Sequence, residues 1–435
     1  MTRVRSVPPE GSWTATYEFD VDDRDGGAPH TVVARGVMTP DELPLPPALE
    51  DAAPFGSASW GCVLPDLRLA LTVPPLDDAL PGLTMLLDAE RGPGLLTRAL
   101  LGGGVLVEGT AVVACAPTVA AYKPGVRATV VCRLGLGADA DAAGADDAAP
   151  ADDFSGPEAV VVKVHSDDEG ERGHEALRSL AQSPLAESPL VQVPRPLAHL
   201  PELRLSVQQH IEHECSLKDL FHAAFEGGGQ SVLARLAEGS RGAGAALAAL
   251  HRSGSGFGEG ETWEQDLAAV RRKHASLVSV VPELGGSVAE ALVRIEAAAA
   301  RTAADLPCPS HGSFHPAQVL VTAERLALID FDKCCQAEPA RDLAAFTTKL
   351  RHMAVNKVDT HRYDPGGAAE VMVETLRETF LGEYTRTAPL SERRLAVWEA
   401  LEVFSLVLSA SKKMLGPRTQ NCVAMLQRHL DDHGL

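Results

Sequence analysis

The chain has few aromatic residues and few basic ones for its length. Phe, Trp and Tyr make up 4% of the 435 residues, so a core must be built mainly from Leu, Val and Ala. Lys and Arg number 39 against 59 Asp and Glu, which gives a formal net charge of −20 at pH 7. Such a charge repels phosphate backbones and anionic lipid surfaces, so it argues against a nucleic-acid-binding or membrane-surface protein.

Long apolar runs and paired cysteines are also missing. No segment has the roughly 20 consecutive apolar residues that a membrane-spanning helix needs, and residues 1–13 lack the apolar stretch of a signal peptide. The eight cysteines include no Cys-x-x-Cys pair and no Cys/His spacing typical of a zinc site. We therefore expect a soluble protein of the cytoplasm, with roughly two to three domains for this length.

Three zones of the chain differ in pattern. Residues 1–110 mix short alternating apolar stretches with many prolines, and we expect a mixed α/β cap or docking domain there. Residues 111–212 predict antiparallel strands, with a turn at Pro124-Gly125. Within this zone, 138–158 hold seven acidic and no basic residues, which predicts a flexible acidic loop. Residues 213–435 predict mainly helices.

Apolar periodicity places the expected elements. The run Val160–Val164 predicts a buried strand that carries Lys163, and the pattern changes to that of a helix from Asp167 onward. The later helices are expected at Ser231–Arg252, Trp263–Val281, Ser287–Ala303, Ala368–Tyr384 and Ser391–Leu408. A small β-rich lobe followed by a larger helical lobe is the predicted outcome, which is an α+β fold class.

The densest group of chemically useful residues lies between 310 and 332. The segment Ser-His-Gly-Ser-Phe-His-Pro-Ala-Gln starts at Ser310, and Asp330 follows after two short apolar triplets, Val319–Val321 and Ala327–Ile329. These triplets predict a hairpin that brings a polar loop next to a carboxylate pair. Because hard divalent cations prefer amide and carboxylate oxygens, this pattern favours Mg²⁺, together with phosphate oxygens.

These segments resemble the catalytic and metal-binding loops of the aminoglycoside phosphotransferase and choline kinase superfamily. The usual pattern there is His-Gly-Asp-x-x-x-x-Asn, then Ile-Asp-Phe/Trp-Asp, then Asp-Pro-x-x-Asp-Leu-Ala, which Glu338–Ala344 resembles. The resemblance covers about residues 112–430. It implies a bilobal protein-kinase-like fold with a β-rich N-lobe and a helical C-lobe, preceded by the cap.

The resemblance also implies roles for individual residues, with ATP and Mg²⁺ as cofactors. Lys163 matches the strand lysine that contacts donor phosphates, and Glu175 matches its helix partner, with Glu171 as a competing choice. The hinge that meets the adenine corresponds to Gln209, His210 and Ile211. Gln318 and Asp330 match the metal ligands. Asp342 matches an acid that ties the catalytic loop.

Two positions depart from the superfamily pattern. Gln318 stands where Asn is usual, as maltokinases of this superfamily also look to have, and it keeps the amide oxygen. Ser313 stands where the catalytic Asp is usual, and a hydroxyl does not accept a proton at neutral pH as a carboxylate does. General-base help is worth about 10²–10⁴-fold. Catalysis would then depend on Ser313 with His311, His315 or Asp332 as substitute bases.

These features lead to three hypotheses. The first is an ATP- and Mg²⁺-dependent phosphotransferase that acts on a hydroxyl of a small molecule, such as an aminoglycoside, a sugar or a choline-like amino alcohol, or of a Ser/Thr side chain in a biosynthetic peptide. The cap would then dock the substrate or a protein partner. The second is a pseudokinase that binds nucleotide or peptide as a scaffold subunit in natural-product biosynthesis. The third is nucleotidyl transfer. No nucleic acid or membrane partner is expected.

Overall fold

The structure is a computed structural model that describes residues 77, 79–138, 156–357, 367–412 and 416–435, and the backbone of five strands between residues 3 and 72; the side chains at 280, 356 and 357 are not described. The part of the acidic segment from 139 to 155 lies outside the described residues. The chain divides into two compact units, Met1–His174 with Arg195–His210, and Glu175–Pro194 with Ile211–Leu435. The predicted domain boundaries near 110 and 212 stay predictions.

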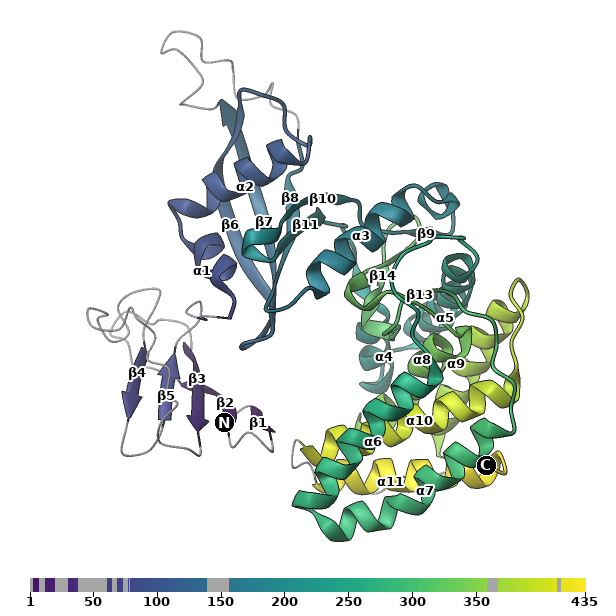
Figure 1. The fold of residues 1–435 in the computed structure, drawn as a ribbon. Helices are drawn as coiled ribbons and strands as arrows, with labels where there is room; N and C mark the ends of the chain where they lie inside the picture. The colour runs from purple at the N-terminus through teal and green to yellow at the C-terminus, as the bar shows by residue number, and fades with distance from the viewer. Residues whose placement is uncertain are drawn as a thin grey trace. The chain divides into compact units, whose positions relative to one another are not determined.

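The first unit starts with an antiparallel sheet in the order β1-β2-β3-β5-β4 (Figure 1). Its strands are β1 (Arg3–Val7), β2 (Ser12–Phe19), β3 (His30–Val37), β4 (Gly61–Leu64) and β5 (Leu69–Thr72). The alternating stretches that predicted strands in the cap fall in β2 and β3. Two helices, α1 (Pro81–Leu87) and α2 (Arg91–Gly102), follow and complete the mixed α/β zone.

A second antiparallel sheet of the same unit has the order β10-β11-β8-β7-β6. Its strands are β6 (Thr110–Lys123), β7 (Arg127–Ala138), β8 (Ala159–His165), β10 (Pro196–Leu200) and β11 (Leu205–Gln209). The hairpin between β6 and β7 turns at Pro124-Gly125, as predicted, and Gly125 has a φ of 67° that favours glycine. Helix α2 packs against β6 and β10. Apolar side chains of α1 and α2 share one core with the valines of β8.

Helix α3 (Glu169–Ala181) leads from the first unit into the second. The second unit is mostly helical, and its helices are α4 (Leu217–Phe225), α5 (Gln230–His251), α6 (Trp263–Val280), α7 (Pro282–Ala300), α8 (Pro339–Lys357), α9 (Ala368–Thr385), α10 (Glu392–Lys412) and α11 (Gly416–Asp432). A β-rich part followed by a helical part confirms the predicted α+β class. The predicted helices match α5, α6, α7, α9 and α10 to within a few residues, whereas α4 and α11 were not predicted.

Two small sheets in the helical unit position the loops of the sequence motif. One has the order β12-β14-β15-β9 and the other pairs β13 with β16. Their strands are β9 (Val191–Gln192), β12 (Cys215–Ser216), β13 (Cys308–Ser310), β14 (Val319–Val321), β15 (Leu326–Leu328) and β16 (Cys335–Ala337). The β14–β15 hairpin is the one predicted from the two apolar triplets.

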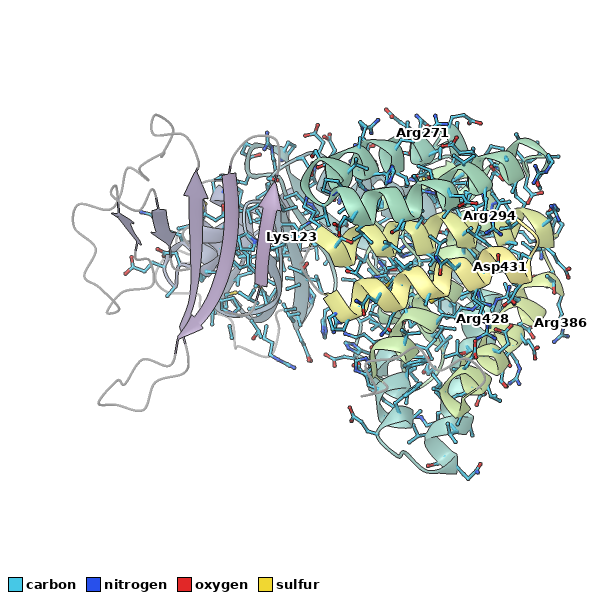
Figure 2. The ribbon with its side chains drawn as sticks, turned by 90° about the horizontal axis from the view of Figure 1, so that it is seen from below. Lys123, Arg271, Arg294, Arg386, Arg428 and Asp431 are labelled. Carbon is cyan, nitrogen blue, oxygen red and sulfur yellow. The ribbon has the colours of Figure 1, made fainter. Side chains whose placement is uncertain are left out.

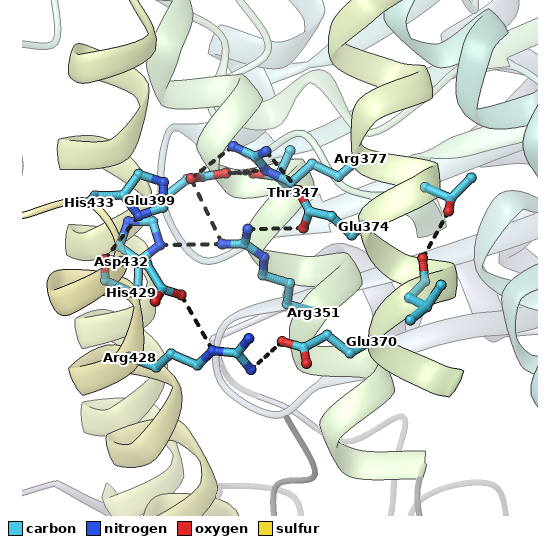
Figure 3. Close-up of polar contacts among 12 residues, drawn as sticks. Thr347, Arg351, Glu370, Glu374, Arg377, Glu399, Arg428, His429, Asp432 and His433 are labelled. Atoms are coloured by element: carbon cyan, nitrogen blue, oxygen red, sulfur yellow. Dashed lines mark hydrogen bonds and ion pairs between the residues drawn. The ribbon is translucent and has the colours of Figure 1, made fainter. Parts of the chain in front are cut away.

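Ion pairs fasten the helices of this unit to one another. On the surface, Arg294 of α7 donates to Asp431 of α11 at 2.9 Å and to the carbonyl oxygen of Leu435 at 2.9 Å (Figure 2). Inside, the fully buried Glu399 of α10 accepts hydrogen bonds from Arg377 of α9 and Thr347 of α8 (Figure 3). Among the described residues, no helix is long and apolar enough to cross a membrane.

Candidate active site

The loop between β13 and β14 carries the His-Gly-Ser segment of the motif. Gly312 lies in this loop with a φ of 77°, and a Cβ placed on it would lie 1.8 Å from the carbonyl oxygen of Lys333. Glycine is therefore required both by the backbone conformation and by the close approach of the next loop. Gly312 thus allows the loops 311–318 and 330–334 to lie in direct contact.

Asp342, in the first turn of α8, holds the same loop from inside. Its side chain is fully buried, its Oδ2 accepts the backbone N–H of His311 at 2.6 Å, and its Oδ1 accepts the N–H of Gly312 at 2.9 Å. Hydrogen bonds to an ionised carboxylate are roughly twice as strong as neutral ones. Asp342 thus ties the loop by accepting hydrogen bonds, as predicted from the sequence.

A buried histidine that the sequence analysis missed stands behind Asp342. His251, at the end of α5, contacts Asp342 Oδ2 through Nε2 at 3.2 Å and Tyr384 Oη through Nδ1 at 2.9 Å. Burial alone would lower the pKa of His251, but the hydrogen bond with Asp342 raises this pKa well above its usual range. Burial likewise opposes ionisation of Asp342, but His251 holds the Asp342 pKa below its usual value. The two form a buried ion pair.

His311 is a loop anchor in this arrangement. Its side chain is fully buried, its Nε2 lies 2.9 Å from the carbonyl oxygen of Ile329, and its ring packs against Phe314 and Phe331. Because Nε2 donates to a carbonyl, Nδ1 is unprotonated in the neutral ring, and it has no hydrogen-bond partner among the described residues. The ring joins the loop 311–318 to Ile329, the residue before Asp330.

The side chains of Gln318, Ser313 and Asp330 come together. Gln318 Nε2 lies 3.2 Å from Ser313 Oγ and 3.3 Å from Asp330 Oδ2, so the amide donates toward both. Gln318 Oε1 accepts the backbone N–H of His315 at 3.0 Å. Since Ser313 Oγ accepts from the amide, its own O–H group is left to donate. Ser313 is therefore placed as a donor, a role that the catalytic Asp of the superfamily pattern does not have.

The oxygen groups of this cluster test whether a divalent cation fits. Asp330 has a φ of 71°, an unusual value for a residue with a side chain, which directs the chain sharply away at the end of β15. Its carboxylate is a suitable ligand for a hard cation, and Asp332, 4% exposed, adds a second acid to the same turn. The side chain of Gln318 can offer an oxygen to the cation only after its amide group rotates, because Oε1 now accepts the backbone N–H of His315.

His315 is a poor substitute base in this structure. Burial, with lesser contributions from Lys349 and His311, lowers the pKa of the His315 ring to about 4. The ring is therefore neutral near pH 7, but its low basicity gives it little driving force to take a proton. Its Nδ1 is buried and has no hydrogen-bond partner within the described part of the chain.

The predicted donor-binding residues belong to both units. Lys163 is 4% exposed in β8, between Thr129 of β7 and Ser206 of β11. Glu175 lies in the other unit, on an exposed position of α3. Of the residues predicted to form the hinge, Gln209 ends β11, and its Oε1 accepts the N–H of Arg195 at 3.3 Å. The division into units falls between the next two residues, His210 and Ile211.

Comparisons with known proteins bear on the fold and the family of the chain. No curated protein sequence matches the chain at a significant level. A choline kinase from Cryptosporidium parvum Iowa II is similar at 11% identity over 78% of this chain and 96% of that chain, with a TM-score of 0.50. A thermostable mutant of an aminoglycoside phosphotransferase is similar at 14% identity over 73% and 95%, with a TM-score of 0.48.

A glucosamine kinase in complex with glucosamine, ADP and inorganic phosphate is similar at 18% identity over 63% of this chain and 77% of that chain, with a TM-score of 0.46. At these identities the structural likeness concerns the fold. The sequence profile of the phosphotransferase enzyme family matches residues 152–380, which is more than half of the chain and includes the loops described above. The chain belongs to the phosphotransferase enzyme family.

Proposed function

We propose that the protein transfers the γ-phosphoryl group of ATP to a hydroxyl group of a small molecule or of a Ser/Thr side chain in a peptide. The observation that carries this proposal is the convergence of Ser313, Gln318 and Asp330 within 3.3 Å contacts, on a loop that Asp342 holds through two backbone N–H groups. Phosphoryl transfer depends mainly on positioning and charge neutralisation. The loop held by Asp342 supplies the positioning, and a Mg²⁺ ion held by Asp330 would supply the neutralising charge.

In this proposal Asp330, with Gln318 after its amide turns, holds Mg²⁺, and Lys163 holds the donor phosphates. The bound metal would neutralise phosphate charge. The acceptor oxygen forms the new bond to the γ-phosphorus, the bond to ADP breaks, and the acceptor proton leaves to solvent or to a nearby carboxylate such as Asp332. The O–H of Ser313 donates a hydrogen bond that orients the acceptor oxygen. Ser313 thus positions the acceptor and does not remove its proton.

Incubation with Mg-ATP and a panel of acceptors tests the proposal. The panel contains an amino sugar, an aminoglycoside, choline and a Ser/Thr peptide, and mass spectrometry detects the gain of one phosphoryl group. We expect one class to be modified by the wild-type protein and not by Asp330→Asn. Modification that persists in Asp330→Asn would contradict the assignment of Asp330. Transfer of a nucleotidyl group instead would be seen as a larger mass gain with release of pyrophosphate.

A scaffold without catalysis is a second candidate, and the hydroxyl at Ser313 favours it because no carboxylate stands at that position. In that case the protein binds nucleotide or peptide and organises partners, with residues 1–110 as the docking part. Binding of Mg-ATP without modification of any acceptor in the panel, and without slow hydrolysis of ATP, would support the scaffold. Measurable ATP hydrolysis that depends on Asp330 would exclude it.

A further inference from the structure

A single buried carboxylate connects the start of α1 to the first hairpin of the second sheet. Asp77 precedes α1 and is 3% exposed. Its Oδ1 accepts the N–H of Ala79 at 3.2 Å, and its carbonyl oxygen accepts the N–H of Leu80 at 2.8 Å. One side of Asp77 therefore shapes the turn that leads into the helix.

The other carboxylate oxygen of Asp77 contacts the hairpin. Its Oδ2 accepts the hydroxyl of Tyr122 at 2.8 Å and the backbone N–H of Gly125 at 2.7 Å. Tyr122 lies near the end of β6, and Gly125 lies in the turn that follows. These contacts join residues that are 45 and 48 positions apart in the sequence, so they fix the hairpin to a separate segment of the chain.

Backbone hydrogen bonds hold the turn as well. Inside it, the N–H of Val126 donates to the carbonyl oxygen of Lys123 at 3.0 Å, and on its far side the N–H of Ser166 donates to the carbonyl oxygen of Val126 at 2.9 Å. The Gly125 N–H is taken by Asp77. Hydrogen bonds from a backbone N–H to an ionised carboxylate are among the stronger ones in proteins. Asp77 therefore determines the orientation of the middle of the turn.

Two cationic residues flank this turn. Lys123 ends β6 and Arg127 begins β7, and the two residues are paired across the hairpin (Lys123 is labelled in Figure 2). An ordered turn fixes the backbone from which both side chains extend. If the proposed function holds, this is the turn of the first hairpin in a kinase-like sheet, and an anionic donor is the ligand that paired cations favour.

We propose that Asp77 is a positioning residue for the nucleotide donor, acting through the β6–β7 turn. The inference rests on the proposed function, and it extends the donor site to a part of the chain before residue 152, where the family match begins. Through Asp77, the segment that leads into α1 helps to order the β6–β7 turn. Asp77 itself does not touch the nucleotide in this proposal.

The test measures two quantities in the full-length protein: the dissociation constant of Mg-ATP by titration calorimetry, and the amide hydrogen exchange of residues 119–130. Asp77→Asn keeps the size and removes the charge. The single amide oxygen of Asn cannot accept all three of the hydrogen bonds that the carboxylate accepts from Ala79, Tyr122 and Gly125, so at least one of them is lost. Because 1.4 kcal/mol corresponds to tenfold in affinity and a hydrogen bond to a charged group is worth at least that much, we expect a rise of about tenfold in the dissociation constant. Exchange in the hairpin should accelerate.

Two further variants separate positioning from general destabilisation. Tyr122→Phe removes one donor and keeps the carboxylate, so it should shift both quantities in the same direction by less. Asp88→Asn is the matched control. Asp88 accepts the N–H groups of Glu90 and Arg91 at 2.9 Å in the exposed link between α1 and α2, and it makes no hydrogen bond or ion pair with the described residues of the hairpin. It should change neither quantity.

The outcomes are distinct. If the wild type binds Mg-ATP and Asp77→Asn binds it equally well, the inference is wrong and the proposed function stands, even where hairpin exchange has accelerated. If the wild type itself does not bind Mg-ATP, the proposed function fails and the inference fails with it. If Asp77→Asn is poorly folded, Tyr122→Phe decides: unchanged affinity and exchange in that variant would also overturn the proposal.

Discussion

Replacing Asp342 with Asn probes the contact on which the loop 311–318 depends. The carboxylate is fully buried, accepts the N–H groups of His311 and Gly312, and pairs with His251. An Asn side chain has one acceptor oxygen and presents N–H groups at its other end, so at least one backbone N–H loses its acceptor. His251 also loses its counter-charge inside the protein. Breaking a buried pair by removing one partner costs about 3–5 kcal/mol.

This cost converts to a melting temperature. At about 2–4 °C for each kcal/mol, Asp342→Asn should lower the melting temperature of the helical unit by roughly 6 to 20 °C. The matched control is Asp431→Asn, which removes a carboxylate that pairs with Arg294 on the surface and whose side chain is 69% exposed. Exposed pairs contribute about 0–1 kcal/mol, so the control should change the melting temperature by a few degrees at most.

The stability that this buried pair contributes depends on pH in a direction that follows from the two pKa shifts. The lowered pKa of Asp342 stabilises the fold above the unfolded carboxyl pKa of about 3.9, and this contribution is lost as the pH falls. The raised pKa of His251 stabilises the fold below the unfolded value of about 6.5, and this contribution is lost as the pH rises through the folded pKa. Thermal unfolding of wild type and Asp342→Asn between pH 4 and 9 should therefore differ most at about pH 4–6.5. Equal melting temperatures at pH 5–6 would refute the buried pair.

Three further predictions concern the same unit. Ser313→Asp should raise ATP hydrolysis by about 10²-fold or more, because it supplies the missing base; an unchanged rate would show that this position is far from the proton that moves. Gln318→Glu should place a like charge about 3.3 Å from Asp330 Oδ2, a repulsion of at most about 5 kcal/mol at an effective dielectric constant near 20. The melting temperature of this variant should therefore be lower than that of the wild type without Mg²⁺, and adding Mg²⁺ should raise it by more than it raises that of the wild type. Equal gains on adding Mg²⁺ would contradict metal binding here. Burial alone would raise the pKa of Glu399, but Arg351 and Arg377 lower it to about 2, so Glu399→Gln should destabilise the unit at pH 7 by about 3–5 kcal/mol. Chemical denaturation should show that the difference in unfolding free energy between the two proteins shrinks as the pH falls below about 4. A difference that is independent of pH would contradict the ion pair.

The sequence predicted elements wherever local patterns were strong. The Pro124-Gly125 turn appears between β6 and β7, and Thr262 forms a capping box with Gln265 at the start of α6, where the periodicity predicted a helix. A mixed α/β zone was predicted for residues 1–110, but the positions of its helices were not, because their first residues resemble helix breakers. α1 begins at Pro81, a favoured residue in the first turn of a helix, whereas the prolines of this zone predicted breaks in long elements.

The site was predictable in composition and less so in geometry. The spacing of Gln318 and Asp330 across a hairpin predicted their proximity, and the motif predicted the role of Asp342. The spacing carried no information on which end of the Gln318 amide faces Asp330, because that depends on the His315 N–H. His251 was missed because its partners, Asp342 and Tyr384, are 91 and 133 residues away in the sequence. Asp77 was missed for the same reason: contacts between distant segments leave no local pattern.

The most direct measurement for the central claim is the affinity for ATP with and without Mg²⁺ in wild type and Asp330→Asn. Asn tolerates the backbone conformation at φ 71° and still accepts the hydrogen bond from Gln318, so the loop should keep its shape while the metal ligand loses its charge. We predict that Mg²⁺ tightens ATP binding to the wild type and has no such effect on Asp330→Asn. Equal tightening in both proteins would contradict a metal-supported phosphotransferase site at Asp330.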